Sequence, residues 1–65
     1  MRIDVNGEAR EVTATRLDKA LEELGWGDAR VATALNGHFV PATARTETPL
    51  AEGDQLEVLG AMQGG

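Results

Sequence analysis

The chain has 65 residues, a formal net charge of −5 at pH 7 and no cysteine. This length allows one small domain, and the lack of cysteine excludes disulfides and thiolate metal sites. The acidic balance argues against nucleic acid as a partner, because phosphate contacts require clustered Lys and Arg. No apolar run is long enough to span a bilayer and no secretory signal is visible, so we expect no membrane association and a cytoplasmic location.

A β-hairpin is predicted at the start of the chain. Residues 1–5 alternate between apolar and polar side chains, as a half-buried strand does. Asn6-Gly7 is the strongest short signal for a two-residue hairpin turn, and residues 8–13 form the return strand. Such a turn places Val12 opposite Met1 on the apolar face.

One amphipathic helix follows the hairpin. Thr15 is expected to cap its N-terminus, with Asp18 in the capping-box position. Gly25 is placed where a left-handed glycine ends a helix, and Trp26 is expected to cover an edge of the core. The apolar stripe of this helix recurs at i, i+3, i+4 and i+7 and consists of Leu17, Ala20, Leu21 and Leu24.

A second hairpin is predicted after the helix. Val31–Leu35 and His38–Val40 flank another two-residue turn, Asn36-Gly37. Pro41 ends the second strand, because proline cannot donate to a sheet ladder. We interpret His38 as a turn or edge histidine rather than a catalytic residue, since no base or orienting partner stands near it in the sequence.

The last third of the chain contains a loop, a strand and a tail. Residues 42–49 are polar and lack a helical period, which predicts a loop that Leu50 anchors in the core. Residues 55–59 alternate again and form the last strand. The predicted fold is therefore α+β, with a mixed sheet covered on one face by the single helix. We expect one domain over residues 1–59 and a flexible C-terminal tail over residues 60–65.

The sequence offers few residues of the kinds that act in catalysis. The chain has no Cys, Ser or Tyr, and its single histidine is His38. Glu22 and Glu23 are adjacent on the helix and do not face each other, so they form a solvated surface rather than an acid–base pair. No metal-ligand spacing or phosphate-binding loop of the known kinds is present. We therefore predict no catalytic residue, no metal site and no enzymatic activity for the chain by itself.

The uncovered face of the sheet is predicted to carry an apolar patch. The Asn36-Gly37 turn pairs Ala34 with Phe39, and paired residues share a face. The more apolar set of the hairpin faces the helix, which leaves Ala32, Ala34 and Phe39 outside, and the last strand adds Leu59. We interpret these four residues as a partner-binding surface. The alternative is that Phe39 folds over a sheet edge.

The C-terminal tail, residues 60–65, has the features expected of a segment that reacts in the active site of another protein. It carries no charged or β-branched side chain, so it fits a narrow channel, and glycine permits close approach of another molecule. A carboxylate on Gly65 is a poor electrophile that requires activation by a partner. The alternative is an ordinary frayed terminus. The tail comprises Gly60, Ala61, Met62, Gln63, Gly64 and Gly65.

Several short motifs together carry a family resemblance. They are the run at residues 31–37, the step Val40-Pro41, the Glu-Gly-Asp at residues 52–54 and the final pair Gly64-Gly65. The chain resembles, over essentially its whole length, the ThiS family of sulfur carrier proteins of thiamine biosynthesis. The family has the ubiquitin-like β-grasp fold. Thr33 departs from the pattern, since a larger apolar residue is commoner there.

The resemblance implies a function with defined partners. An E1-like adenylating enzyme would bind the open face of the sheet and residues 60–63, and would use ATP and magnesium to adenylate the Gly65 carboxylate after Gly64. A persulfide donor would then supply sulfur and leave a thiocarboxylate on Gly65. Thiazole synthase would take this sulfur to build the thiazole ring. The chain itself would bind no cofactor.

Other functions share the same features. The small subunit of molybdopterin synthase and the carriers of tRNA thiolation are related β-grasp sulfur carriers with the same tail chemistry. A ubiquitin-like domain could also act as a plain interaction module with an inert tail, or be conjugated through Gly65 to a lysine of a target protein. These alternatives differ in the modification expected on Gly65.

Overall fold

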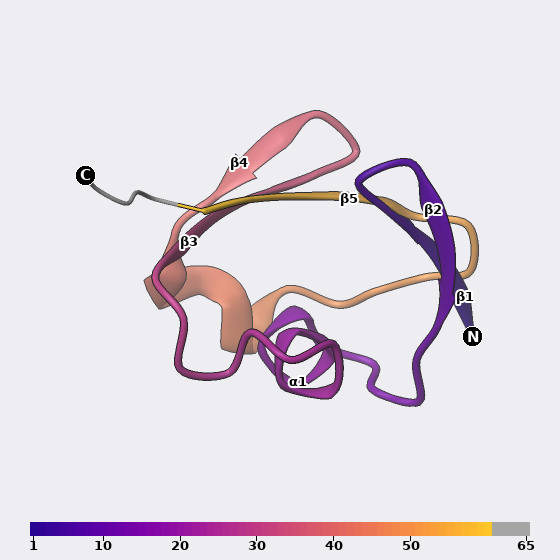
Figure 1. Ribbon diagram of the computed structural model, residues 1–65, viewed down its shortest axis with the longest axis horizontal. Coiled ribbons are helices and arrows are strands. Elements are labelled where there is room, and N and C mark those ends of the chain that lie inside the picture. The colour runs from indigo at the N-terminus through magenta and orange to yellow at the C-terminus, as the bar shows by residue number, and fades with distance from the viewer. Residues whose placement is uncertain (61–65) are drawn as a thin grey trace.

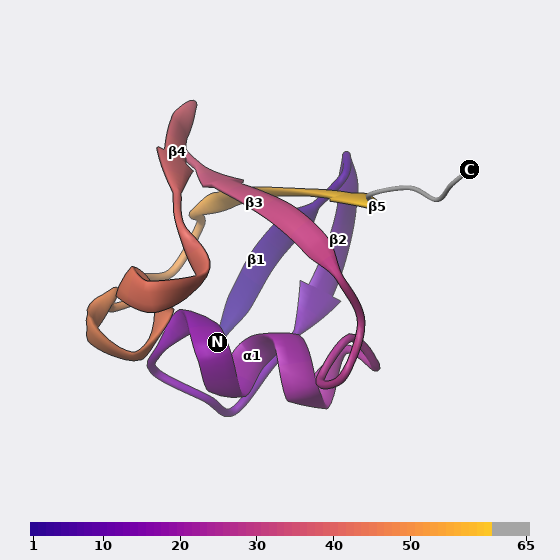
Figure 2. The same ribbon diagram turned by 90° about the vertical axis from the view of Figure 1, so that its left-hand side faces the viewer.

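Five strands form one mixed sheet, and the single α-helix of the described chain lies across one face of it (Figures 1 and 2). The computed structural model describes residues 1–60. The strand order is β2-β1-β5-β3-β4, with β5 parallel to β1 and antiparallel to β3. The predicted α+β arrangement is confirmed. The elements are β1 (Arg2–Val5), β2 (Glu8–Glu11), α1 (Leu17–Glu23), β3 (Val31–Leu35), β4 (His38–Val40), the 3₁₀ helix η1 (Ala42–Glu47) and β5 (Gln55–Gly60).

Both Asn-Gly pairs form the predicted two-residue turns. Asn6 and Asn36 have φ values of 53° and 51°, and the glycine that follows each of them also has a positive φ. Two consecutive positive φ angles define the turn whose twist matches that of a hairpin. The register of both hairpins is the predicted one, and Val12 exchanges hydrogen bonds with Met1 beyond the end of β2.

The side chains of the two turn asparagines also hold the central strand β5. The Asn6 side chain donates from Nδ2 to the Val58 carbonyl (3.1 Å) and accepts at Oδ1 from the Val58 N–H (2.9 Å). It thereby continues the β1–β5 pairing past Val5, where the backbone of β1 turns away. Asn36 acts in the same way at the start of β5, where its Oδ1 accepts from the Gln55 N–H (2.9 Å).

Replacing Asn6 by glycine is expected to lower the free energy of unfolding by about 1–2 kcal/mol. Glycine keeps the positive φ of the turn but removes both hydrogen bonds to Val58, which leaves two backbone groups of β5 without these partners. Urea unfolding followed by circular dichroism measures the change. Asn6→Asp, which keeps the acceptor and loses the donor, is expected to fall between the two. Equal stability of Asn6→Gly and the unsubstituted chain would contradict this role.

The N-terminus of α1 differs from the sequence-based expectation. The predicted cap, Thr15, is wrong: the N-cap residue is Arg16, which makes no side-chain capping hydrogen bond. The segment before Leu50 takes over this function. The Leu17 N–H donates to the Thr48 carbonyl (2.9 Å), and the Thr15 carbonyl accepts from the Leu50 N–H (2.9 Å). A donor at the helix end is thus satisfied by backbone from a distant segment, which sequence-local capping rules do not anticipate.

The C-terminus of α1 is the predicted one. Gly25 has a φ of 99°, and its N–H donates to the Glu22 carbonyl (3.1 Å) while the Trp26 N–H donates to the Leu21 carbonyl (2.8 Å). This pair of hydrogen bonds is the Schellman motif. Trp26 is half-buried and packs against the core, which confirms its predicted position.

The segment before Leu50 is not the plain loop that we predict from its sequence. Residues 42–47 form the 3₁₀ helix η1, which starts after Pro41 and packs beside α1. The Ala44 N–H donates to the Pro41 carbonyl (2.9 Å), and the Thr48 hydroxyl donates to the Ala44 carbonyl (2.7 Å). Three residues per turn do not produce the 3.6-residue period that marks an α-helix, so the sequence pattern misses this element.

Arg45 on η1 forms a hydrogen bond that accounts for a polar residue, Thr33, at a buried position of β3. Thr33 is 1% exposed, and its hydroxyl donates to the Val40 carbonyl (2.8 Å) while accepting from Arg45 Nε (3.1 Å). Arg45 also donates to the Val31 carbonyl (2.7 Å). A valine at position 33 would remove the acceptor of Arg45 Nε and leave the guanidinium bonded only to the Val31 carbonyl among these two partners. The polar residue therefore fastens η1 to the sheet.

The connection between β2 and α1 is held by a carboxylate. Glu23 accepts hydrogen bonds from the hydroxyl and the N–H of Thr13, and from the Ala14 N–H. These bonds, above all the one from the Thr13 hydroxyl, hold the pKa of Glu23 below its usual value. The bonded carboxylate therefore fixes the approach of the chain to α1 whenever it is ionised.

The core lies between α1 and the facing side of the sheet. Leu50 is among its residues, which confirms its predicted role as an anchor. Leu35, Val31 and Leu24 pack around the edge of this cluster. The buried apolar residues of the described chain are Ile3, Val5, Val12, Leu17, Ala20, Leu21, Val40, Leu50, Leu56 and Val58.

Candidate functional site

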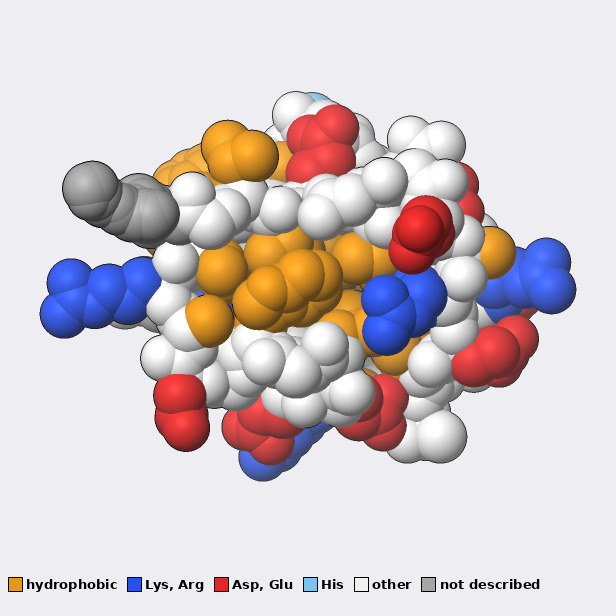
Figure 3. Space-filling model, viewed as in Figure 1, with side chains coloured by type: hydrophobic (Ala, Val, Ile, Leu, Met, Phe, Trp, Pro, Cys, Tyr) orange, Lys and Arg blue, Asp and Glu red, His pale blue; other side chains and the backbone are white. Residues whose placement is uncertain are grey.

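The face of the sheet opposite α1, here called the open face, carries the most exposed large apolar side chains of the described chain. Phe39 is 70% exposed and Leu59 is 72% exposed. Figure 3 shows hydrophobic side chains gathered near the β3–β4 hairpin, and a second group between β5 and α1 where the edge of the core is visible. The alternative in which Phe39 folds over a sheet edge and becomes covered does not occur.

The strand registers bring the predicted patch together. Ala34 pairs with Phe39 on one side and with Glu57 on the other, and Ala32 pairs with Leu59. Directly paired residues share a face, so these side chains form one continuous strip across β4, β3 and β5. Because alanine side chains are small, the surface is lower at Ala32 and Ala34 than at Phe39 and Leu59. The predicted composition of this surface is confirmed, whereas its role in binding a partner stays a prediction.

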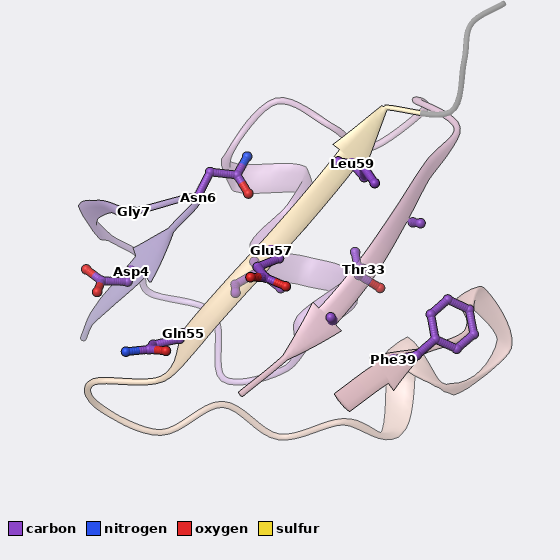
Figure 4. A pocket seen from close by; sticks show the side chains of 11 residues that line it. Asp4, Asn6, Gly7, Thr33, Phe39, Gln55, Glu57 and Leu59 are labelled. Carbon is purple, nitrogen blue, oxygen red and sulfur yellow. The ribbon is translucent and has the colours of Figure 1, made fainter. Parts of the chain in front are cut away.

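The open face is hollowed along the strip, and the hollow has a polar side. Figure 4 shows Phe39 and Leu59 on one side, with Asp4 and Gln55 on the other. Gln55 and Glu57 alternate along β5 with the buried Leu56 and Val58, so they lie on the same face as Leu59. Asp4 and Asn6 are residues that sequence reasoning misses, because they reach the site through the parallel pairing of β1 with β5, some 50 residues away in the sequence. The alternation of residues 1–5 does place Asp4 on the outer face, but it gives no neighbour for it.

The last described residue belongs to the sheet. Gly60, predicted from the sequence to begin the tail, is the final residue of β5 and pairs with Val31. It follows Leu59 directly, so the route to the C-terminal residues begins at the edge of the apolar strip. The predictions for the rest of the tail lie outside the described residues and concern Ala61, Met62, Gln63, Gly64 and Gly65.

The described part of the chain shows no assembled catalytic centre. His38 is exposed on the edge strand β4. Within residues 1–60, no three His, Asp or Glu side chains are grouped to hold a metal ion. Over the same range, every buried polar side-chain atom has a hydrogen-bond partner. No helix in that part of the chain is long and apolar enough to cross a bilayer. What the described surface offers is an exposed apolar strip that ends next to Gly60.

Comparison with known proteins identifies the family. The model of the ThiS family matches residues 3–65, nearly the whole chain. This chain belongs to the ThiS family. It is 38% identical over 61 residues to the sulfur carrier protein ThiS of Thermus thermophilus, covering 94% of this chain and 95% of that protein. The resemblance inferred from the sequence motifs is thereby confirmed.

The solved structures of ThiS proteins share the fold. The crystal structure of the thiamine biosynthesis protein ThiS from Geobacter metallireducens superposes with a TM-score of 0.83 at 30% identity, with full coverage of both chains. The solution structure of a thiamine biosynthesis protein from the same organism gives a TM-score of 0.78 at 29% identity, covering all of this chain and 88% of that one. The fold of this chain is thus the β-grasp fold, as predicted.

A larger protein also contains a region similar to this chain. The thiazole synthase of Paramagnetospirillum magneticum is 33% identical over 66 residues, which covers all of this chain but 20% of that protein. A ThiS-like region is therefore joined to a much longer polypeptide in that organism. The remaining four fifths of that protein have no counterpart in this chain.

Proposed function

We propose that this chain is a sulfur carrier of thiamine biosynthesis, and that Gly65 carries the sulfur as a C-terminal thiocarboxylate. The observation that carries the proposal is the 38% identity with a sulfur carrier protein ThiS over 61 residues, together with the match of the ThiS family model to residues 3–65, a range that includes Gly64-Gly65. The open face supports the proposal, because a carrier protein needs a surface that an enzyme can bind, next to the chain end that reacts. That surface leads directly into Gly60.

The proposed chemistry begins with activation of a carboxylate. An oxygen of the Gly65 carboxylate attacks the α-phosphate of ATP in an adenylating enzyme, pyrophosphate leaves, and an acyl-adenylate forms. Magnesium on that enzyme would neutralise the phosphate charge. The terminal sulfur of a persulfide then attacks the acyl carbon and AMP leaves. A second thiol cleaves the resulting sulfur–sulfur bond, which releases a disulfide and leaves the thiocarboxylate.

The residues of this chain contribute position and access rather than catalysis. Glycine at positions 64 and 65 places no Cβ beside the reacting carbon, so the attacking atom meets little steric resistance. Strand β5 is anchored on both edges, by β3 along its length and by β1 with Asn6 on the other side. Docking of the open face therefore fixes the starting point of the tail, which lowers the entropic cost of placing Gly65 in an active site.

We further propose that thiazole synthase accepts the sulfur. A thiazole synthase in another organism includes a region similar to this entire chain, and a fused carrier and acceptor would work at high effective concentration. We propose that this chain meets the synthase through the open face. A tail without charged side chains is compatible with a narrow entrance in either partner.

Intact-mass measurement tests the proposed function. The purified chain is incubated with the adenylating enzyme, ATP, magnesium, a persulfide donor and an excess of a small thiol that cleaves the acyl disulfide, and its mass is compared with that of a sample lacking ATP. Exchange of one oxygen for sulfur on the C-terminal peptide supports the carrier function. A covalent adduct with another polypeptide would indicate conjugation instead, and an unchanged mass in all samples would overturn the proposal.

A further inference from the structure

Two carboxylates on the open face have no cationic partner within residues 1–60. The ion pairs on this part of the chain join Arg2 and the N-terminal amine to Glu11, and Lys19 to Glu22. Neither Asp4 nor Glu57 takes part in any of them. Both nevertheless line the hollow of the open face, which makes its polar side negative.

The two carboxylates stand on neighbouring strands within reach of one ligand. Asp4 pairs with Gln55 in the parallel β1–β5 ladder, and Glu57 follows two residues further along β5. Strand geometry separates the Cα atoms of such diagonal neighbours by about 8 Å. Glu57 also lies directly beside Ala34 of the apolar strip. Both residues line the hollow, and Figure 4 shows them on adjacent strands, with the Asp4 side chain extending from β1 to the side away from β5.

A protein that covers the apolar strip must also compensate the negative charges beside it. A partner that packs on Phe39 and Leu59 also takes water away from Glu57, and a carboxylate that loses its water without gaining a counter-charge is strongly destabilising. A second negative charge at Asp4 increases this penalty. This requirement is met when the partner supplies a cation at this point.

We propose that thiazole synthase, the proposed sulfur acceptor, presents an arginine that lies between Asp4 and Glu57, beside its apolar contact with Phe39 and Leu59. A guanidinium has five N–H donors in a planar fork and can bond two carboxylates at once, whereas an ammonium is a compact point charge. The inference rests on the proposed function, in which the open face receives a partner enzyme. It adds that Asp4 and Glu57 determine which protein surface is accepted.

The test uses the full chain and the thiazole synthase of the same organism. Glu57→Gln, Asp4→Asn and the double variant are compared with Glu47→Gln, which makes the same charge change on η1, beside α1 rather than on the open face. The dissociation constant is measured by calorimetric titration at low and high salt, and thermal unfolding verifies that each variant is folded.

Each substitution on the open face is expected to weaken binding about tenfold, and the double variant by less than the product, since one guanidinium serves both carboxylates. The affinity of both single variants should also depend less on salt. Equal affinities of Glu57→Gln and Glu47→Gln would overturn this inference alone, provided the unsubstituted chain binds and forms the thiocarboxylate. Failure of the unsubstituted chain to do either would overturn the proposed function with it.

Discussion

Removal of Gly65 is expected to abolish sulfur transfer while leaving the unfolding transition unchanged. The proposed reacting carbon belongs to this residue, and a chain shortened by one position ends about 3.5 Å short of the partner's catalytic groups. A displacement of about 1 Å can already cost a hundredfold in rate. Within residues 1–60 the buried core runs from Ile3 to Val58, and we expect stability not to depend on position 65. Thiocarboxylate formation is followed by intact mass and unfolding by circular dichroism.

A matched control distinguishes the loss of Gly65 from a general effect of altering the C-terminus. Gln63→Ala keeps both glycines and the chain length, so it is expected to form far more thiocarboxylate than the Gly65 deletion, although position 63 belongs to the segment expected to contact the adenylating enzyme. Adding one alanine after Gly65 is expected to be as damaging as the deletion, because it displaces the carboxylate and gives it a Cβ neighbour. Normal transfer by either length variant would show that Gly65 does not carry the sulfur.

The open face could be derived from the sequence because its geometry is local. Asn36-Gly37 adopts the turn that this dipeptide favours, and a two-residue turn leaves one possible register. That register puts Phe39 opposite Ala34 and away from the core. Once Thr33 and Val40 are assigned to the helix side, the exposure of Phe39 follows from the two-residue alternation of a strand.

The features that sequence reasoning missed all depend on contacts between distant segments. The N-terminus of α1 is satisfied by the backbone of Thr48, and η1 is fastened to β3 through Arg45 and Thr33. Asp4 and Asn6 join the open face only because β1 pairs in parallel with β5. No rule based on neighbouring residues gives the partner of a strand 50 positions away.

The replacement of Phe39 by aspartate is expected to weaken binding of the adenylating enzyme by about 2 kcal/mol, or roughly 30-fold, with little change in stability. Phe39 is the larger of the two exposed apolar residues on the strip and is 70% exposed. Its side chain therefore contributes little to folding but offers the main apolar contact to a docking protein. The new carboxylate would also join Glu57, which is separated from position 39 only by Ala34.

His38→Asp is the matched control for this substitution. It introduces the same residue one position earlier in β4, where the side chain is also exposed but belongs to the opposite face of the strand. Both variants share the cost of aspartate in an edge strand, so the difference between them isolates the contribution of the open face. We expect His38→Asp to be adenylated at the normal rate and Phe39→Asp to require a much higher concentration. Equal impairment, or unfolding of Phe39→Asp alone, would show that Phe39 serves the fold and that the partner binds elsewhere.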